Sequence, residues 1–326
     1  MTNRKQLTKI DEHLSCELPN DRGVPQGSVL GPLLFIIYIN DIVNSIKNSK
    51  INLFADDTLL YYSDHNVDNA IIKINEDLNE LQKWLQENNL SLNIKKTKAM
   101  IINKRNLTNI KNNIIFNGEK IDIVSEIKYL GVMLDEKLNF EPHTKYILNK
   151  ITKKYHILRR INRKTTAHSQ ILLYNSLISP HFDYCSTVLF LLNKNQKGKL
   201  QKMQNKIMRL ILKMKFDTSI KFMLNCLQWL SVEQRIKFNT LKFIWKMENG
   251  HLPEYMCNKL TKRSESQAYN LRNNDEFNTT NHKKKSSQNS LFYKGVNLYN
   301  SFKRQFKSNS NFYEFKRNCI KFVKMT

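Results

Sequence analysis

Two adjacent aspartates, Asp56 and Asp57, interrupt an otherwise apolar stretch, I-N-L-F-A-D-D-T-L-L-Y-Y, at residues 51–62. Carboxylate oxygens are ligands that Mg²⁺ prefers, so the pair is a candidate metal site. Neighbouring side chains on a regular strand point to opposite faces, so a turn is needed to aim both carboxylates at one site. The apolar runs on either side predict two strands joined by such a turn. Asp also favours turns by hydrogen-bonding its own backbone, and this alternative explains the pair without a metal.

A second candidate site precedes this hairpin, where the loop G-V-P-Q-G-S at residues 23–28 leads into a long apolar helix. Ser28 is a good N-cap residue. Backbone N–H groups and the Gln26 amide at a helix N-terminus favour phosphate oxygens. An ordinary buried helix that follows a Gly-Pro loop is the alternative. Because the helix is apolar nearly all round until residues 40–41, we expect it to be buried under a sheet.

The elements that follow the aspartates alternate between helix and strand patterns. Residues 69–89 predict an amphipathic helix with Trp84 in the core, and we expect its acidic residues on the opposite side. Asn117-Gly118 is a strong hairpin signal. Strands are expected at 99–102 and 127–134, and a glycine inside the second marks a bulge or a close backbone approach. The acidic residues of the helix are Glu76, Asp77, Glu80 and Glu87.

From Pro142 onward, helical periodicity replaces the strand patterns. We expect helices over 143–163, 169–192 with an interruption at Pro180, 200–214 and 232–248. A polar flexible linker is expected at 261–290, and a small helical cap beyond it. The first helix carries a one-sided set of basic residues: Lys145, Lys150, Lys153, Lys154, Arg159, Arg160 and Arg163, with Lys164 just beyond.

The composition points to a polyanionic partner. The 326 residues contain 53 Lys and Arg against 28 Asp and Glu, a formal net charge of +25. Nucleic acid is the commonest such partner, and nothing in the sequence resembles an amphipathic membrane anchor or a lipidation signal. The five cysteines form no C-x-x-C pair, which argues against a zinc ribbon or knuckle. With no apolar signal core and no run long enough to span a bilayer, we expect an intracellular protein of the cytoplasm and nucleus.

Four blocks occur in a fixed order with sensible spacing: G-V-P-Q-G-S-V-L-G-P-L-L-F-I-I-Y-I-N-D at 23–41, L-F-A-D-D-T at 53–58, N-I-K-K-T at 93–97 and Y-L-G-V at 129–132. Together they resemble the palm of reverse transcriptases, the RNA-directed DNA polymerases, from LINE-type non-LTR retrotransposons, and most of all those of jockey-like elements. The resemblance continues through residues 174–185, 200–209 and 227–235, and so covers most of the chain.

The resemblance implies an α+β fold: a partial polymerase palm, an antiparallel sheet with packed helices, followed by a mostly α-helical thumb and C-terminal region. Its expected parts are a palm at 1–140, a thumb or connection region at 141–260, the linker at 261–290 and the cap at 291–326. The implied partners are an RNA template, a DNA primer or duplex, and a dNTP, with Mg²⁺ or Mn²⁺ as the cofactor.

The same resemblance assigns roles to residues of this sequence. Asp56 and Asp57 would be catalytic metal ligands, and Lys96 would pair with or protonate the pyrophosphate leaving group. A solvated surface lysine is the alternative for Lys96. The nucleotide and template contacts would be Pro25, Gln26, Gly27, Ser28, Phe54 and Ala55, and the primer grip would be Tyr129, Leu130 and Gly131.

One departure from the family pattern changes the expected activity. Such palms need a further Asp on an earlier strand, and only Asp11 and Asp21 precede residue 23, neither at the end of an apolar strand. We therefore expect an N-terminally truncated copy that lacks the fingers and the first catalytic Asp, and that does not polymerise DNA alone. A palm without its central strand would expose a sheet edge and apolar surface. A non-catalytic RNA- or DNA-binding remnant and a product of a decayed element remain as alternatives.

Overall fold

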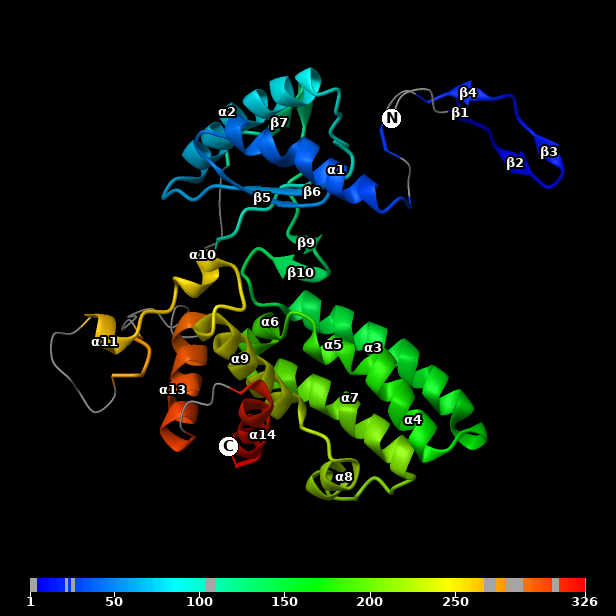
Figure 1. Cartoon of the computed structure of the whole chain (residues 1–326), viewed down its shortest axis with the longest axis vertical. Helices are drawn as coiled ribbons and strands as arrows, with labels where there is room; N and C mark the ends of the chain where they lie inside the picture. Colours follow the sequence, from blue (N-terminus) through cyan, green and yellow to red (C-terminus); the bar gives the residue numbers. More distant parts are fainter. Residues whose placement is uncertain are drawn as a thin grey trace. The chain divides into compact units, whose positions relative to one another are not determined.

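The computed structural model describes residues 5–20, 23–24, 27–103, 110–266, 274–279, 290–306 and 311–325. The chain divides into two compact units, residues 1–125 and 126–326 (Figure 1). Helices and small antiparallel sheets make up the described part, and each of these sheets has two strands. The mixed class that the sequence predicts is therefore confirmed at this level.

The first unit begins with an extended ribbon. Strand β1 (Lys5–Gln6) pairs with β4 (Leu18–Pro19), and β2 (Lys9–Ile10) pairs with β3 (His13–Leu14). Their side chains are exposed, so the ribbon depends on backbone pairing rather than on a core of its own.

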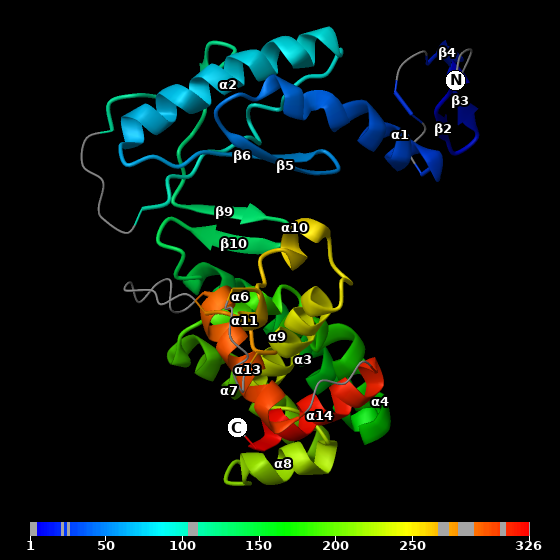
Figure 2. The same ribbon diagram turned by 60° about the vertical axis from the view of Figure 1, so that its left-hand side comes forward.

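The core of the first unit lies under α2 (Val67–Glu87), the amphipathic helix that the sequence predicts. Around it lie α1 (Leu30–Ile39), β5 (Lys50–Phe54) and β6 (Asp57–Tyr61) (Figure 2). The hairpin of β7 (Ile115–Phe116) and β8 (Glu119–Lys120) belongs to the same unit. Trp84 is buried as expected. The other buried apolar residues of this core are Ile39, Ile42, Ile71, Leu78, Leu81, Ile114, Phe116 and Ile121.

The predicted burial of the apolar helix α1 is wrong. Of its residues only Gly31 and Ile39 are buried, whereas Ile37 is 64% exposed and Val29, just before the helix, is 93% exposed. A helix that is apolar on all sides needs cover on all sides. The two-stranded sheets of the described residues cannot give that cover, and the expected apolar surface and sheet edges are present.

Two predicted strands also take another form. The stretch 99–102 contributes a single bridge, between Ala99 and Ile123, instead of a strand. The stretch 127–134 is a hairpin of β9 (Glu126–Tyr129) and β10 (Val132–Asp135). Leu130 and Gly131 turn the chain with φ of 43° and 81°, so the glycine lies in a turn and not in a bulge. The Asn117-Gly118 hairpin is confirmed, with φ of 50° and 77°, as a type I′ turn requires.

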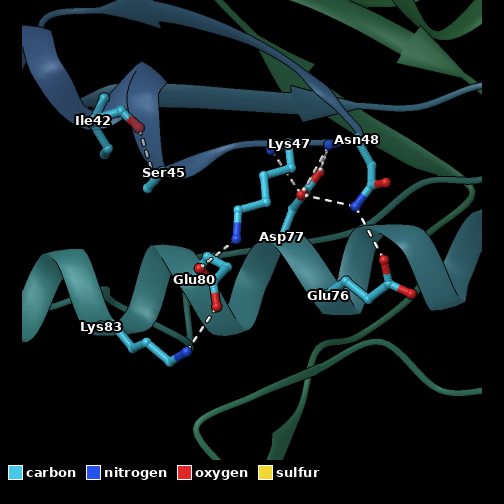
Figure 3. A network of polar contacts seen from close by, with 8 residues as sticks. All are labelled: Ile42, Ser45, Lys47, Asn48, Glu76, Asp77, Glu80 and Lys83. Atoms are coloured by element: carbon cyan, nitrogen blue, oxygen red, sulfur yellow. Dashed lines mark hydrogen bonds and ion pairs between the residues drawn. The ribbon is translucent and has the colours of Figure 1, made fainter.

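The sequence misplaces Asp77, one of the acidic residues of α2. It is completely buried instead of lying on the solvent side of the helix. Its carboxylate accepts backbone N–H groups from Lys47 at 3.0 Å and Asn48 at 3.1 Å (Figure 3). It also accepts the Ser49 N–H at 2.6 Å. These bonds fix the loop that leads into β5, which carries the candidate site.

The hydrogen bonds to Asp77 also change its acidity. Burial alone would raise the pKa of the Asp77 carboxyl, because it disfavours the charged form. The hydrogen bonds from Ser49, Asn48 and Lys47 outweigh burial and hold this pKa below its ordinary value. Asp77 is therefore a charged group that stabilises the fold.

The second unit is mostly helical. The predicted helices are present. In the stretch 169–192, a π-helical turn at 174–178 precedes the short helix that begins at Pro180, and a further break, which the sequence does not predict, falls at Tyr184 and Cys185. Helix α8 was not expected. The helices of its first part are α3 (Glu141–Ile161), α4 (Ala167–Leu173), α5 (Pro180–Asp183), α6 (Ser186–Leu191), α7 (Lys194–Leu212), α8 (Ile220–Leu227) and α9 (Val232–Glu248).

The C-terminal helices α13 (Val296–Gln305) and α14 (Phe312–Met325) share an aromatic core with α9. Short helices α10 (Glu254–Cys257) and α11 (Arg263–Ser266) precede them. Within the expected linker, Phe277 is buried in this core, and Asn300 bonds its backbone N–H at 3.0 Å and its carbonyl at 2.9 Å. The rest of that linker, residues 267–273 and 280–289, lies outside the described residues.

Among the residues described, no helix combines the length and the apolar character needed to cross a membrane.

Candidate active site

The aspartate pair lies at the tip of the hairpin formed by β5 and β6, as the sequence predicts. Phe54 and Asp57 are the last paired residues, so Ala55 and Asp56 form the two-residue turn. Ala55 has φ of 52°, a left-handed conformation that costs a residue with a Cβ about 1–2 kcal/mol. Such a strained conformation persists only where the surrounding structure holds it in place. Here the pairing of β5 with β6, up to Phe54 and Asp57, holds the turn.

The tip presents its carboxylates to solvent. Asp56 and Asp57 are exposed, as are Phe54 and Ala55 beside them. Two carboxylates supply part of a Mg²⁺ ligand set, which waters and substrate phosphates usually complete. No group of three or more His, Cys, Asp or Glu side chains that could hold a metal ion occurs among the described residues. The tip therefore offers an open, two-carboxylate site.

The glycine-rich loop before α1 is described in part. Pro25 and Gln26 lie outside the described residues. Gly27 has φ of 83°, where a residue with a Cβ would be strained, and no atom lies within 4 Å of the position its Cβ would occupy. The Ser28 hydroxyl accepts the backbone N–H of Gly31 at 3.0 Å, a bond of the kind expected from a capping serine, although the residue directly before α1 is Val29.

Lys96 lies on a compact turn. The Asn93 carbonyl accepts the backbone N–H of Lys96 at 3.1 Å and the hydroxyl of Thr97 at 2.9 Å. The Asn93 side-chain oxygen also accepts the Lys96 N–H, at 3.2 Å, so the side chains of Asn93 and Thr97 both stabilise this turn. The Lys96 side chain is exposed, which both the catalytic role and the surface alternative require.

The Tyr129-Leu130-Gly131 turn belongs to the second unit, where a residue that the sequence analysis missed holds it. The Tyr184 hydroxyl donates a hydrogen bond to the Leu130 carbonyl. A Cβ on Gly131 would lie 3.2 Å from the Tyr184 ring, so this glycine does permit a close approach. Tyr184 lies within the stretch 169–192 that the sequence predicts to be helical, but it is extended between α5 and α6, and nothing in the sequence pairs it with residue 130.

The basic residues of α3 are distributed as predicted, with one exception. Lys154 is half-buried, and its Nζ lies 2.8 Å from both the Leu177 carbonyl and the His181 Nε2. Burial and the nearby Lys154 lower the pKa of His181. The remaining residues of the set are exposed: Lys145, Lys150, Lys153, Arg159, Arg160, Arg163 and Lys164.

Lys128 of β9 and Lys150 of α3 both lie against the ring of Tyr146. The Nζ atoms of Lys150 and Lys128 lie 4.8 Å and 5.5 Å from the centre of the Tyr146 ring. The two ammonium groups, Lys150 first, hold the pKa of the Tyr146 hydroxyl below its ordinary value. Positive charge is therefore concentrated where the β9–β10 hairpin meets α3.

Comparison with known proteins identifies the first part of the chain. Residues 2–134 match the family described as "Reverse transcriptase (RNA-dependent DNA polymerase)". This range includes the hairpin tip, the loop before α1 and Lys96. The chain therefore carries a reverse transcriptase domain.

The relatives of the chain are RNA-directed DNA polymerases of non-LTR retrotransposons, as the sequence resemblance predicts. The chain is 26% identical over 261 residues to the "Probable RNA-directed DNA polymerase from transposon BS" of Drosophila melanogaster, a match that covers 77% of this chain. It is 27% identical over 213 residues, 62% of the chain, to the "RNA-directed DNA polymerase from mobile element jockey" of the same species. It is 26% identical over 187 residues, 54% of the chain, to the "Retrovirus-related Pol polyprotein from type-1 retrotransposable element R1 2" of Nasonia vitripennis.

These matches cover 29%, 23% and 45% of the three relatives. The chain thus spans less than half the length of each relative. A match of 261 residues must also extend beyond residue 134, so the similarity includes part of the helical unit.

Proposed function

We propose that this chain is the part of a retrotransposon RNA-directed DNA polymerase that carries the carboxylate hairpin and the helices that hold nucleic acid. The observation that carries the proposal is the exposed Asp56–Asp57 tip, which lies on a strained turn inside the reverse transcriptase domain. The family and the relatives support the reaction class, RNA-templated DNA synthesis from dNTPs.

In this proposal Asp56 and Asp57 hold Mg²⁺ or Mn²⁺ at the tip. The metal would supply activation of the primer 3′-hydroxyl and stabilisation of the leaving oxygens in a two-metal nucleotidyl transfer. Their exposure and their place at a turn support this role, because a turn frees the pair from the alternation of a strand.

Other residues would position the substrates. The loop before α1, with Gly27 and Ser28, would contact the nucleotide and template, together with Phe54 and Ala55 beside the carboxylates. Lys96 would pair with the pyrophosphate leaving group. The Tyr129–Gly131 turn would hold the primer end, and the glycine that admits the Tyr184 ring supports a turn built for close backbone approach.

The helices after residue 141 would form a thumb that holds the duplex through its phosphates. The one-sided exposed basic residues of α3 support this role, because phosphate contacts need positive charge and read no base sequence. This assignment makes residues 1–140 a partial palm and 141–260 the thumb.

We further propose that the polypeptide 1–326 does not polymerise DNA by itself. The tip supplies two carboxylates, and no third metal-ligating side chain is grouped with them in the described part of the chain, which supports this proposal. The test is primer extension on an RNA template with a DNA primer, dNTPs and Mg²⁺ or Mn²⁺. The double variant Asp56→Ala/Asp57→Ala sets the background, and incorporation by the wild-type chain above that background refutes the statement.

A non-catalytic nucleic-acid-binding protein is the second candidate, and the exposed basic residues of α3 are the observation that favours it. Such a protein binds nucleic acid with a steep salt dependence that the Asp56→Ala substitution leaves unchanged. If Asp56→Ala abolishes metal-dependent nucleotide binding or incorporation, the polymerase function is favoured instead. Replacing Lys145, Lys153 and Arg159 by Gln should reduce binding in either case, which makes that variant a control for the assay.

A further inference from the structure

The C-terminal end of α7, the loop after it and α8 form an exposed surface that the proposed polymerase function does not use. Phe216 in this loop is 88% exposed, the highest value for an aromatic side chain among the described residues. Phe222 on α8 is 51% exposed, while Met223 next to it is completely buried. Helix α8 therefore packs one face inward and leaves the other in solvent. We call Lys206, Arg209, Lys213, Lys215, Phe216, Lys221 and Phe222 the α7–α8 surface.

The charge of this surface is strongly one-sided. Residues 206–221 contain five basic residues and a single acidic residue, Asp217. Lys206, Lys213, Lys215 and Lys221 are exposed. Lys213 ends α7 with φ of 52°, and this left-handed residue turns the chain so that the loop with Phe216 can leave the helix axis. A surface of this kind is complementary to a polyanion.

The Phe216 ring is oriented by a basic side chain. The guanidinium carbon of Arg209 lies 4.9 Å from the centre of the Phe216 ring, a cation–π contact. The partly buried Arg209 supports the ring on one side, although most of the ring remains accessible to solvent. An exposed, supported aromatic ring among lysines is the arrangement on which unpaired bases stack.

We propose that the α7–α8 surface binds single-stranded RNA, with a base stacked on Phe216 and with Lys213, Lys215 and Lys221 on neighbouring phosphates. Bases in a duplex are already stacked on one another and cannot reach such a ring, so the surface selects unpaired strands. RNA is the choice because an RNA template is the single-stranded polymer that the proposed polymerase must handle; to that extent the inference rests on the proposed function.

The location of the surface separates it from the proposed primer grip. Within the second unit, α8 lies at the end away from the β9–β10 hairpin (Figures 1 and 2). A strand bound at α8 is therefore a contact additional to any nucleic acid held at Tyr129–Gly131.

The test measures the affinity of the full chain for a fluorescent oligo(A) RNA by anisotropy. Phe216→Ala and Phe216→Leu are expected to weaken binding about 10-fold or more, because each removes a stacking ring. Phe216→Trp is expected to retain binding. The matched control is Tyr313→Ala, because Tyr313 is 80% exposed and lies 5.9 Å from the Lys316 Nζ, and it should leave the affinity unchanged.

The other arms separate the alternatives. Binding of a double-stranded RNA of the same length should be insensitive to all Phe216 variants, and an equal loss there refutes stacking on an unpaired base. Single-stranded DNA bound more tightly than the RNA refutes the choice of RNA. If Phe216→Leu retains RNA binding, no base stacks on this ring and the proposal is overturned. If only binding to anionic phosphatidylserine vesicles responds to Phe216→Ala, the surface fits a membrane and the proposal is likewise overturned. None of these outcomes depends on Asp56 or Asp57, so they are independent of polymerase activity.

Discussion

Removal of the Asp77 carboxylate should open the loop that supports the candidate active site. The side chain is completely buried and accepts three backbone N–H groups, so Asp77→Ala leaves three donors without their acceptor. Hydrogen bonds to a charged group contribute about 1.5–3 kcal/mol each. Because Lys47 is exposed and Asn48 and Ser49 are only half-buried, water replaces part of each bond. We therefore expect a loss of about 3 kcal/mol, or about 1 per bond.

Hydrogen exchange measured by mass spectrometry is the suitable assay, because peptides from the first unit can be followed separately from the rest of the chain. A loss of about 3 kcal/mol should speed the exchange of amides at 47–54 by about 100-fold. Asp77→Asn keeps one acceptor oxygen and should lie between Asp77→Ala and the wild type.

The matched control is Glu80→Ala, one helical turn away. Glu80 is bonded to Lys47 at 3.1 Å and to Lys83 at 2.7 Å, yet both lysines are exposed and Glu80 is only half-buried (Figure 3). Exposed ion pairs contribute little, so this variant should exchange like the wild type. If Asp77→Ala and Glu80→Ala behave alike, the buried carboxylate does not support the loop and the reasoning is refuted.

The effect of Asp77 should also depend on pH, with a definite sign. Since its pKa is lower in the folded chain than in the unfolded chain, the stabilisation is present above about pH 4 and is lost as the pH falls through the folded value. The ratio of exchange rates between Asp77→Ala and the wild type should therefore approach one in acid. A ratio that stays constant would contradict the assignment of the charge to Asp77.

Three changes in the second unit have equally definite outcomes. Burial lowers the pKa of His143, whose Nδ1 accepts the Met133 N–H at 3.3 Å. The stabilisation from neutral His143 should therefore be complete above about pH 6.5 and should decrease as the pH is lowered. His143→Gln should weaken the pH dependence of the urea midpoint, and an unchanged dependence would show that His143 is not its cause. Arg235→Ala breaks two hydrogen bonds of 2.6 Å to Asp183 and should lower the free energy of unfolding in urea by about 2–3 kcal/mol. Arg235→Lys should restore only part of this free energy. A change near zero would show that the pair does not stabilise the fold. Tyr184→Phe should lower the free energy of unfolding by about 1 kcal/mol, because it removes the hydrogen bond to the Leu130 carbonyl. It should also shift the NMR amide signals of the Leu130 turn but not those of the helices, and unchanged signals would show that Tyr184 does not hold this turn.

The sequence predicts well those features that depend on neighbours along the chain. The β5–β6 hairpin, the Asn117-Gly118 turn and helix α9 were all correctly located, because alternation, turn chemistry and helical periodicity are local patterns. The sequence predicts a strand through Leu130 and Gly131 because this turn lacks the Asn or Asp that usually precedes glycine in such hairpins.

The features that sequence reasoning missed depend on partners far away in the chain. Helical spacing alone predicts Asp77 in solvent, because it cannot show that a loop 28 residues earlier brings its N–H groups over this position. Tyr184 reaches a carbonyl 54 residues away, and Phe277 of the expected linker is buried against helices on both sides of it in the chain. The roles of the site residues, Asp56 and Asp57 included, stay predictions until they are tested as described above.

The exposed apolar surface of α1 should affect how the chain responds to salt. At low ionic strength, the net charge of +25 keeps copies of the chain apart. Added salt screens this repulsion over about 10 Å at 0.1 M and leaves the attraction between apolar surfaces intact. The chain should therefore become less soluble as ionic strength rises. In a salt titration of nucleic-acid binding, self-association through residues such as Val29 and Ile37 would lower the concentration of free protein. This loss would occur over the same range of salt concentration in which the phosphate contacts weaken. Light scattering recorded alongside the titration separates the two losses.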